Sequence, residues 1–234
     1  MKIGVLEAGP NVASLRDRFG SFTDMFRAWL EPVADDATFV GYRVFENGLP
    51  DSVAACDAYM VTGSAASVFD SSPWIAPLSD FVVSAARDRK IAGICFGHQL
   101  LAQAFGGTVE RSEKGWGAGI QHYDVAADDV PDWMQPCRRQ VTLGASHQDQ
   151  VTALPPGAVP LAGNRFCPNA MMQIGDNALA VQPHPEFPPS FMVGLIDAVS
   201  HRYDDDLEVT ARASLDLPMD CDVLAAWVWR FLSR

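Results

Sequence analysis

The sequence predicts an α/β fold in which a mostly parallel, twisted sheet carries helices on both faces and a small antiparallel extension. Short apolar runs at residues 3–6, 38–44, 58–62 and 91–94 are typical of buried strands, and amphipathic helical patterns lie between several of them. Alternating strands and helices favour parallel strands, because each crossover helix then covers a face of the sheet. We expect one domain over residues 1–234, since no internal repeat or low-complexity linker divides the chain.

Two of the predicted helices have clear apolar stripes. Ser21 is a suitable N-cap for a helix that runs to about residue 31, because its hydroxyl can accept a hydrogen bond from a backbone N–H of the first turn. The buried stripe of this helix is expected to contain Phe22, Phe26, Trp29 and Leu30. A second amphipathic helix is expected from the spacing of Trp74, Leu78, Phe81, Val82, Ala85 and Ala86.

The pattern changes in the second half of the chain. Residues 108–151 form shorter segments rich in Gly, Pro and Asp, which we interpret as the antiparallel extension that brings Ser146 and His147 toward the carboxyl ends of the parallel strands. A helical tail is expected from about residue 189 onward, with the three aspartates at 204–206 as a solvated turn. Its packing stripe is expected to contain Val223, Trp227, Val228 and Phe231.

Composition limits the classes of partner. The chain has 234 residues, 48% of them hydrophobic, and a formal charge of −12, which argues against nucleic acid and anionic membranes because both bind basic surfaces. Five cysteines without a C-x-x-C pair suit reduced thiols better than a disulfide framework. The N-terminus resembles a strand rather than a signal peptide, and no apolar run approaches the length that spans a membrane. We therefore expect a cytoplasmic protein.

The run Gly93-Ile94-Cys95-Phe96-Gly97-His98-Gln99 is the most informative stretch of the chain. It joins a predicted strand to a helical pattern, with a glycine two residues before Cys95 and another two residues after it. This arrangement predicts a nucleophile elbow, a tight strand-to-helix turn that only glycine neighbours allow. The thiol would project from the edge of the sheet at a helix N-terminus, which favours the thiolate. The other four cysteines are expected to be inert buried thiols.

His184 and Glu186 supply the other two groups of a catalytic cysteine site. In an extended segment the side chains at i and i+2 point the same way, and Pro183 and Pro185 are expected to keep this segment extended. The Glu186 carboxylate would then hold one nitrogen of the His184 ring while the other faces the thiol. This is the nucleophile–base–orienter arrangement of a catalytic triad.

These motifs resemble class I glutamine amidotransferases, and most of all the glutaminase domain of GMP synthase. The resemblance runs from residue 1 to about 187. Part of it, at residues 19–26, is similar to a stand-alone branch that includes gamma-glutamyl peptidases. The resemblance implies a flavodoxin-like sheet, a γ-glutamyl substrate and no cofactor. Its motifs are the elbow, the His-Pro-Glu run and the segments 61–64, 114–117, 146–149 and 166–170.

Further site residues follow from the spacing and from the resemblance. The N–H of Phe96, directly after the nucleophile, is expected to form one side of an oxyanion hole, and the resemblance places the second N–H at Gly63. Gln99, one helical turn after Cys95, can face the same crevice. By resemblance it binds the glutamyl head, and backbone groups of Ser146 and Gln148 hold the α-amino and α-carboxyl groups. The GMP synthase pattern has Ser-His-Gly-Asp here, so the side chain of Gln148 reshapes the pocket.

Several assignments stay open at the level of sequence. His98 and His147 are expected to orient loops around the site rather than to act as bases, and Trp116 either walls the pocket or packs the extension. No metal site is expected, because the His and Cys spacings do not match paired ligands. No nucleotide-binding loop occurs, and no second large domain follows, so we do not expect a complete GMP synthase.

Three functions are compatible with these residues. The first is a self-contained hydrolase of γ-glutamyl amides, and the second is a glutaminase subunit that passes ammonia to a separate synthetase. The third is a noncatalytic binding protein on the same scaffold, which the intact set of Cys95, His184 and Glu186 disfavours. The sequence predicts neither the leaving group nor the oligomeric state.

Overall fold

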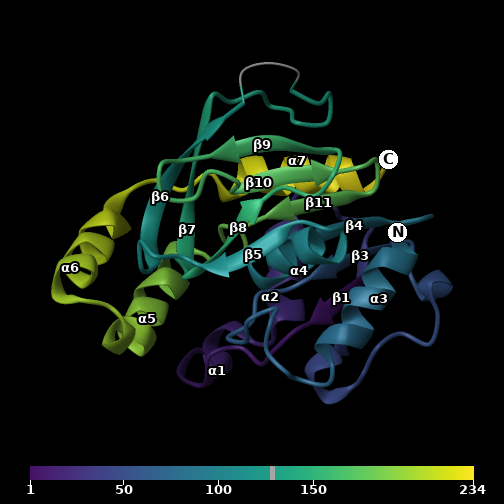
Figure 1. Ribbon diagram of the computed structural model, residues 1–234, viewed down its shortest axis with the longest axis horizontal. Helices are drawn as coiled ribbons and strands as arrows, with labels where there is room; N and C mark the ends of the chain where they lie inside the picture. The colour runs from purple at the N-terminus through teal and green to yellow at the C-terminus, as the bar shows by residue number, and fades with distance from the viewer. Residues whose placement is uncertain (127–129) are drawn as a thin grey trace.

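The computed structural model describes residues 1–126 and 130–234, and residues 127–129 of the predicted extension lie outside the described part (Figure 1). Within that part nine strands form one sheet in the order β2-β1-β3-β4-β11-β10-β9-β6-β7, and β5 and β8 form a separate two-stranded sheet. The strands are β1 (Lys2–Glu7), β2 (Thr38–Arg43), β3 (Ala58–Val61), β4 (Lys90–Ile94), β5 (Thr108–Arg111), β6 (Gly117–Val125), β7 (Gln140–His147), β8 (Asp149–Ala153), β9 (Ala158–Gly163), β10 (Met171–Ile174) and β11 (Ala178–Val181).

The large sheet is parallel on one side and antiparallel on the other. Strands β2, β1, β3, β4 and β11 pair in parallel, whereas β10, β9, β6 and β7 continue the sheet with antiparallel neighbours. This confirms the predicted fold class. The antiparallel part is broader than expected from residues 108–151, because β9 and β10 also join it and the β10–β11 hairpin leads the chain back into the parallel half.

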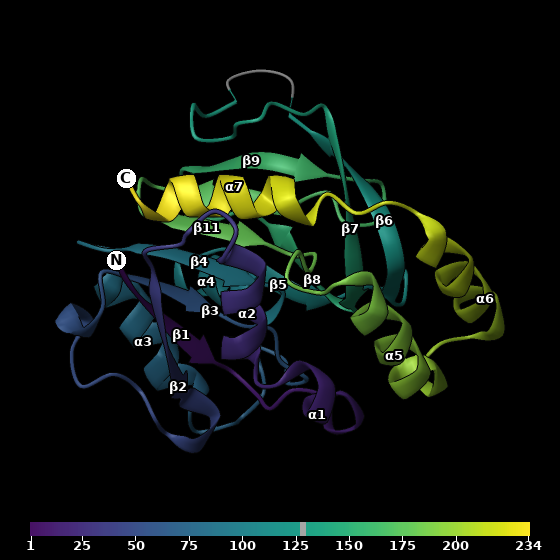
Figure 2. The same cartoon turned by 180° about the vertical axis from the view of Figure 1, so that it is seen from behind.

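Helices cover both faces of the parallel half, as the sequence predicts. Helices α2 and α7 pack on one face and α3 and α4 on the other (Figures 1 and 2). The indole Nε1 of Trp29 in α2 donates a hydrogen bond of 2.8 Å to the carbonyl oxygen of Cys221, which joins the two helices of the first face. The α-helices are α1 (Arg16–Phe19), α2 (Phe22–Leu30), α3 (Ile75–Ala85), α4 (Phe96–Ala104), α5 (Pro189–Val199), α6 (Asp205–Ala213) and α7 (Cys221–Leu232).

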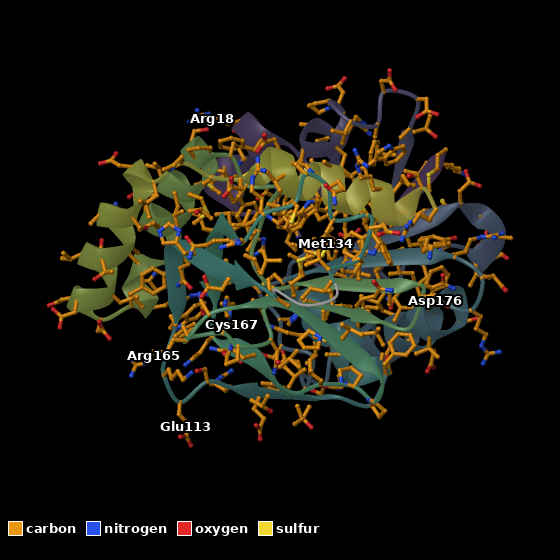
Figure 3. All side chains as sticks on the ribbon, turned by 90° about the horizontal axis from the view of Figure 1, so that it is seen from above. Arg18, Glu113, Met134, Arg165, Cys167 and Asp176 are labelled. Atoms are coloured by element: carbon orange, nitrogen blue, oxygen red, sulfur yellow. The ribbon has the colours of Figure 1, made fainter. Side chains whose placement is uncertain are left out.

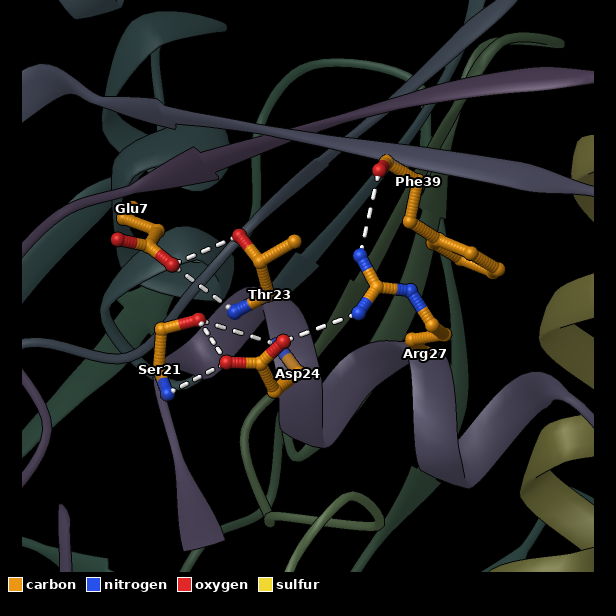
Figure 4. A network of polar contacts seen from close by, with 6 residues as sticks. All are labelled: Glu7, Ser21, Thr23, Asp24, Arg27 and Phe39. Atoms are coloured by element: carbon orange, nitrogen blue, oxygen red, sulfur yellow. Dashed lines mark hydrogen bonds and ion pairs between the residues drawn. The ribbon is translucent and has the colours of Figure 1, made fainter. Parts of the chain in front are cut away.

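The start of α2 is tied to the end of β1 by buried polar contacts (Figure 4). Ser21 caps the helix by accepting from the Asp24 N–H at 3.2 Å, and the Asp24 carboxylate accepts from the Ser21 N–H at 2.9 Å, which confirms the predicted N-cap. The Glu7 carboxylate accepts from the N–H and the hydroxyl of Thr23 at 2.9 and 2.7 Å. A carboxylate at a helix N-terminus is stabilised by the helix dipole, so the first turn of α2 is fixed against the carboxyl end of β1.

The tail is helical, and its predicted stripe of Val223, Trp227, Val228 and Phe231 is buried. The prediction of a solvated turn at 204–206 is wrong. Asp204 is the N-cap of α6 and its carboxylate accepts from the Leu207 N–H at 2.8 Å, while the next two aspartates form the first helical turn. Helix α6 packs against β6, and α5 contacts α6, β6 and residues 13–15, which precede α1 (Figures 1 and 2).

The interior is filled mainly by apolar side chains, and most charged groups lie at the periphery, although Glu7, Asp149 and Glu186 are buried. Figure 3 shows Met134 and Cys167 inside the packed layers, whereas Arg18, Glu113 and Asp176 extend outward. In the described part of the chain, none of the helices combines the length and the apolarity needed to cross a membrane.

Candidate active site

Cys95 lies at a strained turn between β4 and α4. Its backbone has φ +53° and ψ −101°, a conformation that residues with a Cβ rarely adopt. The Cys95 N–H donates to the Val181 carbonyl at 2.8 Å, so the turn is anchored to β11, and the residue is only 6% exposed. The predicted elbow is therefore present at the carboxyl end of β4, an inner strand of the parallel half.

The two glycines that flank the elbow are required by close backbone contacts. A Cβ on Gly93 would lie 2.3 Å from the Gly97 carbonyl oxygen, and a Cβ on Gly97 would lie 2.5 Å from the Val61 carbonyl oxygen. Neither backbone atom can retreat as a flexible side chain would. The close approach that the sequence predicts for these glycines is thus confirmed, and it joins α4 to both β4 and β3.

His184 and Glu186 meet beside this elbow. The His184 ring Nδ1 lies 2.7 Å from Oε1 of Glu186, and both side chains are buried. The expectation of an extended segment is wrong beyond His184, because Pro185 and Glu186 form a turn. Only His184 makes a strand-like contact, with its N–H donating to the Gly144 carbonyl at 2.8 Å. The turn folds the carboxylate back onto the ring that it holds.

The electrostatic setting favours a protonated His184. Burial alone lowers the pKa of its ring, but the negative charges of Glu186 and Cys95 outweigh burial and raise the pKa to about 10. At neutral pH the ring is therefore an imidazolium that faces both the carboxylate and the sulfur. Burial raises the pKa of Cys167 to about 12, and it does the same to Cys221, so these two thiols are poor nucleophiles.

Gly63 and Phe96 lie where two backbone donors would be needed. A Cβ on Gly63 would meet Cε1 of His184 at 2.9 Å and Cβ of Cys95 at 3.7 Å, so this glycine lies against both groups. Phe96 is the first residue of α4, and a first-turn N–H has no carbonyl partner earlier in its own helix. The two positions expected for an oxyanion hole thus flank Cys95.

Gln99 reaches the turn between β7 and β8, but its side-chain NH₂ group is already hydrogen-bonded within the protein. Its Nε2 donates to the Asp149 carbonyl at 2.9 Å and to the side-chain oxygen of Gln182 at 3.1 Å. Both N–H groups are used within the protein, so only the side-chain oxygen remains for a ligand. Gln99 therefore anchors the turn between β7 and β8 to the nucleophile helix, and its predicted contact with a glutamyl head stays a prediction.

Ser146 lies near the end of β7 and Gln148 lies between β7 and β8, and both residues are half-buried. Ser146 lies two residues beyond Gly144, whose carbonyl oxygen accepts from the His184 N–H, so β7 brings Ser146 close to His184. The Gln148 carbonyl accepts from the Ser112 N–H at 3.1 Å, which connects the turn to the segment before β6. The antiparallel extension thus brings residues 146–148 toward Cys95, as expected.

His98 and His147 are buried histidines that hold loops. The ring Nε2 of His98 lies 2.8 Å from the Asn169 carbonyl oxygen, and Nδ1 of His147 lies 3.1 Å from that of Asp149. Burial lowers the pKa of His98 to about 3 and that of His147 to about 4, so both rings are neutral at physiological pH. Their contacts agree with the predicted role of orienting loops.

Trp116 packs against the helical tail. Its ring lies 5.9 Å from that of Tyr203, and the Arg202 guanidinium lies 5.8 Å from its centroid. These contacts favour packing of the extension, one of the two roles left open by the sequence. Among residues 1–126 and 130–234, no group of three or more His, Cys, Asp or Glu side chains is arranged to hold a metal ion.

The comparisons with known proteins agree with this geometry. The family model for glutamine amidotransferase class-I matches residues 53–192, which contain the elbow, the pocket turn and the His-Pro-Glu run. The chain belongs to this family.

Among its relatives, gamma-glutamyl peptidase 3 of Arabidopsis thaliana is 30% identical over 68% of this chain and 66% of its own length. One of the subunits of the glutamine-hydrolysing GMP synthase of Methanosarcina acetivorans is 39% identical over 42% of this chain and 51% of its own. A solved glutamine amidotransferase from Thermotoga maritima superposes with a TM-score of 0.79 at 15% identity, covering 100% of this chain and 99% of that one, which shows a shared fold.

Three residues near the site of this glutamine amidotransferase were not predicted from the sequence. Asp149 accepts a very short hydrogen bond from the Ser67 hydroxyl and lies 3.5 Å from the Arg111 guanidinium, so it clamps the loop after β3 to the pocket turn. Gln182 receives the amide of Gln99, and Phe187 stacks on His184. The position of Gln182 and Phe187 on either side of the His-Pro-Glu run was the available signal, but Gln99, the partner of Gln182, lies 83 residues away in the sequence.

Proposed function

We propose that this chain hydrolyses a γ-glutamyl amide, either glutamine or a γ-glutamyl peptide or conjugate, through a thioester on Cys95, and that it acts without a synthetase. One observation carries the proposal. Cys95 stands at a strained elbow beside His184, whose ring is held by Glu186 at 2.7 Å and carries a positive charge at neutral pH. A thiolate facing an imidazolium is the resting state that an amide-cleaving cysteine requires.

In the first half-reaction the Cys95 sulfur attacks the γ-carbonyl carbon and forms a C–S bond. The carbonyl oxygen becomes an oxyanion that the N–H groups of Phe96 and Gly63 stabilise, because fixed donors at this point favour the transition state over the ground state. His184 donates its proton to the departing nitrogen as the C–N bond breaks. Ammonia or an amine leaves, and the γ-glutamyl group remains on Cys95.

In the second half-reaction water attacks the thioester. The now neutral His184 takes a proton from this water while the new C–O bond forms, and the oxyanion returns to the same two donors. The C–S bond then breaks, glutamate is released and Cys95 leaves as the thiolate beside a protonated His184. Glu186 holds the ring through both halves without transferring a proton itself.

The choice of a stand-alone hydrolase is supported by the relatives and by the pocket. Gamma-glutamyl peptidases are among the proteins most similar to this chain, and Gln148 stands where the GMP synthase motif has glycine. Because its side chain reshapes the pocket, a substrate other than free glutamine is favoured. The polar contacts of Gln99 and Asp149 hold the pocket turn without any partner chain.

A second candidate function is a glutaminase subunit that delivers ammonia to a separate synthetase. The similarity to GMP synthase subunits of Methanosarcina acetivorans and Thermococcus kodakarensis favours it, and the chemistry up to the thioester would be identical. The two candidate functions differ in whether the isolated chain hydrolyses its substrate. The active site of a subunit that delivers ammonia to a partner is often completed only when the partner binds.

The test is a screen of the purified protein against glutamine and a panel of γ-glutamyl dipeptides and thioether conjugates, with mass spectrometry of the products. We expect release of glutamate from at least one γ-glutamyl compound without nucleotide, metal or second protein, and no release by Cys95→Ala. If the purified protein released glutamate from no compound of the panel, and a synthetase that co-purifies from the native cell restored the release, the chain would be an ammonia-delivering glutaminase instead.

A further inference from the structure

The His184 ring is held on its face as well as at its edge. The Phe187 ring stacks on it with a centroid distance of 4.0 Å and an interplanar angle of 5°, and both residues are buried. Glu186 binds Nδ1 in the plane of the imidazole. A single hydrogen bond leaves the ring free to tilt about the bond axis, whereas a parallel ring in contact with its face removes that freedom.

Phe187 is itself fixed by other aromatic rings. Phe191 of α5 lies 4.2 Å from it, and Phe19 of α1 packs edge-on against Phe191 at 5.1 Å. Phe22 of α2 stacks on Phe187 from another side at 6.4 Å. Helices α1 and α5 lie side by side in both views (Figures 1 and 2). Rings from the first thirty residues and from the tail therefore brace the ring that touches the catalytic histidine.

The stacked geometry also acts on the charge of His184. The face of a phenyl ring is negative, so it attracts a cation placed over it, and the attraction is larger where water is excluded. The titratable groups that face His184 are Cys95, Glu186 and His147, while Cys221 faces Glu186. The neutral His147 adds no attraction, so Phe187 is the uncharged contact that favours the imidazolium.

We propose that Phe187 is a positioning residue that fixes the plane of the His184 ring and stabilises its cationic form. The inference rests on the proposed role of His184 in proton transfer. It accounts for Phe22, which packs on Phe187, and for Phe19, which packs on the neighbouring Phe191, although neither touches a reacting atom. A phenyl face cannot give or take protons, so Phe187 acts only through His184.

The test compares Phe187→Leu with Phe191→Leu, which removes a ring of the same stack that pairs with Phe187 and Phe19 rather than with His184. The readouts are the pH profile of kcat/KM and an NMR titration of ¹³C-labelled histidine rings, with the His184 signal assigned from its loss in His184→Gln. In Phe187→Leu the alkaline limb, which reports the deprotonation of His184, should move down by about 0.5 to 1 pH unit from its position in the parent protein. The acid limb of the profile should not shift, because His184 is protonated at pH values both below and above that limb.

In the same variant kcat should fall about 10-fold with little change in KM, because the ring loses its orientation and the substrate pocket does not. Phe191→Leu should lower the melting temperature as much as Phe187→Leu does, but it should not shift the alkaline limb of the pH profile. Phe187→Tyr, which keeps the ring face, should restore the limb. Where Phe187→Leu folds poorly, Phe187→Met replaces it.

An unmoved His184 titration in Phe187→Leu, or an equal shift in Phe191→Leu, would overturn the proposal. The NMR titration needs no substrate. If every compound of the panel were inert, the proposed function would fail while the titration would still decide the role of Phe187.

Discussion

Cys95 is held by backbone contacts of the elbow with the strands beneath it, whereas the β7–β8 turn that faces it is held by polar side chains 50 and 82 positions away from Asp149. The elbow depends on Gly93 and Gly97, on a single strained backbone and on the strands directly beneath it. The turn depends on Gln99 and Ser67, which reach Asp149 from α4 and from the loop after β3. The elbow is thus built by close backbone contacts, and the β7–β8 turn by polar side-chain contacts.

This contrast indicates how the two regions should respond to substitution. Changes at the elbow should abolish chemistry and leave the fold intact, as long as they respect the glycine contacts. Changes in the buried polar contacts should loosen the pocket and lower stability together, because a buried donor or acceptor left without a partner destabilises the folded state.

The largest effect is expected at the nucleophile. Cys95→Ala should reduce turnover by at least about 10³-fold, since a unit of nucleophile and base fails when either is lost, and its melting temperature should stay near that of the parent. An electrophilic glutamine analogue should label Cys95 alone. Cys167→Ala is the matched control, because burial raises the pKa of that thiol to about 12 and keeps it unreactive. Labelling that mapped to Cys167 would contradict the assignment.

A large effect is also expected when the orienting carboxylate loses its charge. Glu186→Gln keeps the shape but removes the charge that raises the pKa of His184, so kcat should fall by about 10² to 10⁴. KM should change less, because Glu186 is buried behind the ring. Stopped-flow or steady-state kinetics would measure both. An unchanged kcat would show that another residue orients His184.

An intermediate effect is expected from the contact that joins the two regions. Gln99→Met leaves the Gln182 side-chain oxygen without its donor and removes one of the two contacts of the Asp149 carbonyl, which keeps the His147 ring. The free energy of unfolding should therefore fall by about 1 to 3 kcal/mol. KM should rise more than kcat falls, since the turn moves and the elbow does not. Urea denaturation and kinetics would measure these changes. Gln103→Met, at an exposed position of the same helix, should change neither quantity.

The smallest effect is expected in the acid stability of the pocket. His98 and His147 bind protons more weakly in the folded than in the unfolded chain, because burial lowers their pKa values to about 3 and about 4. Their contribution is complete above about pH 6.5 and is lost as the pH falls, by up to about 1.4 kcal/mol per pH unit for each ring.

His98→Asn should therefore flatten the decline of the urea midpoint between pH 6.5 and 5, and a replacement of the exposed His201 should not. His184 behaves in the opposite sense. Its raised pKa gives a stabilising contribution that is complete below about pH 6.5 and is lost as the pH rises toward about 10. A steeper decline in His98→Asn would show that the ring is protonated when folded.

The sequence by itself determined the α/β class, the parallel strands, the helix capped by Ser21 and the elbow. These features follow from apolar periodicity, from capping chemistry and from glycines next to Cys95, all of which act within a few residues. It also placed Glu186 beside His184, although the contact is made by a turn rather than by an extended strand.

Only the tertiary structure decided how the pocket is closed. Strands β9 and β10 join the antiparallel part, and the side-chain amide of Gln99 donates to Asp149 and Gln182. The Phe187 ring stacks on His184 and is braced by Phe191, which in turn contacts Phe19. The pairing of β9 with β6, the contacts of Gln99 and the contact of Phe19 with Phe191 join segments that are distant in sequence, and an amide or a phenyl ring has no fixed partner until the chain has folded. Local patterns therefore predict where the chemistry lies, and long-range packing determines how firmly it is held.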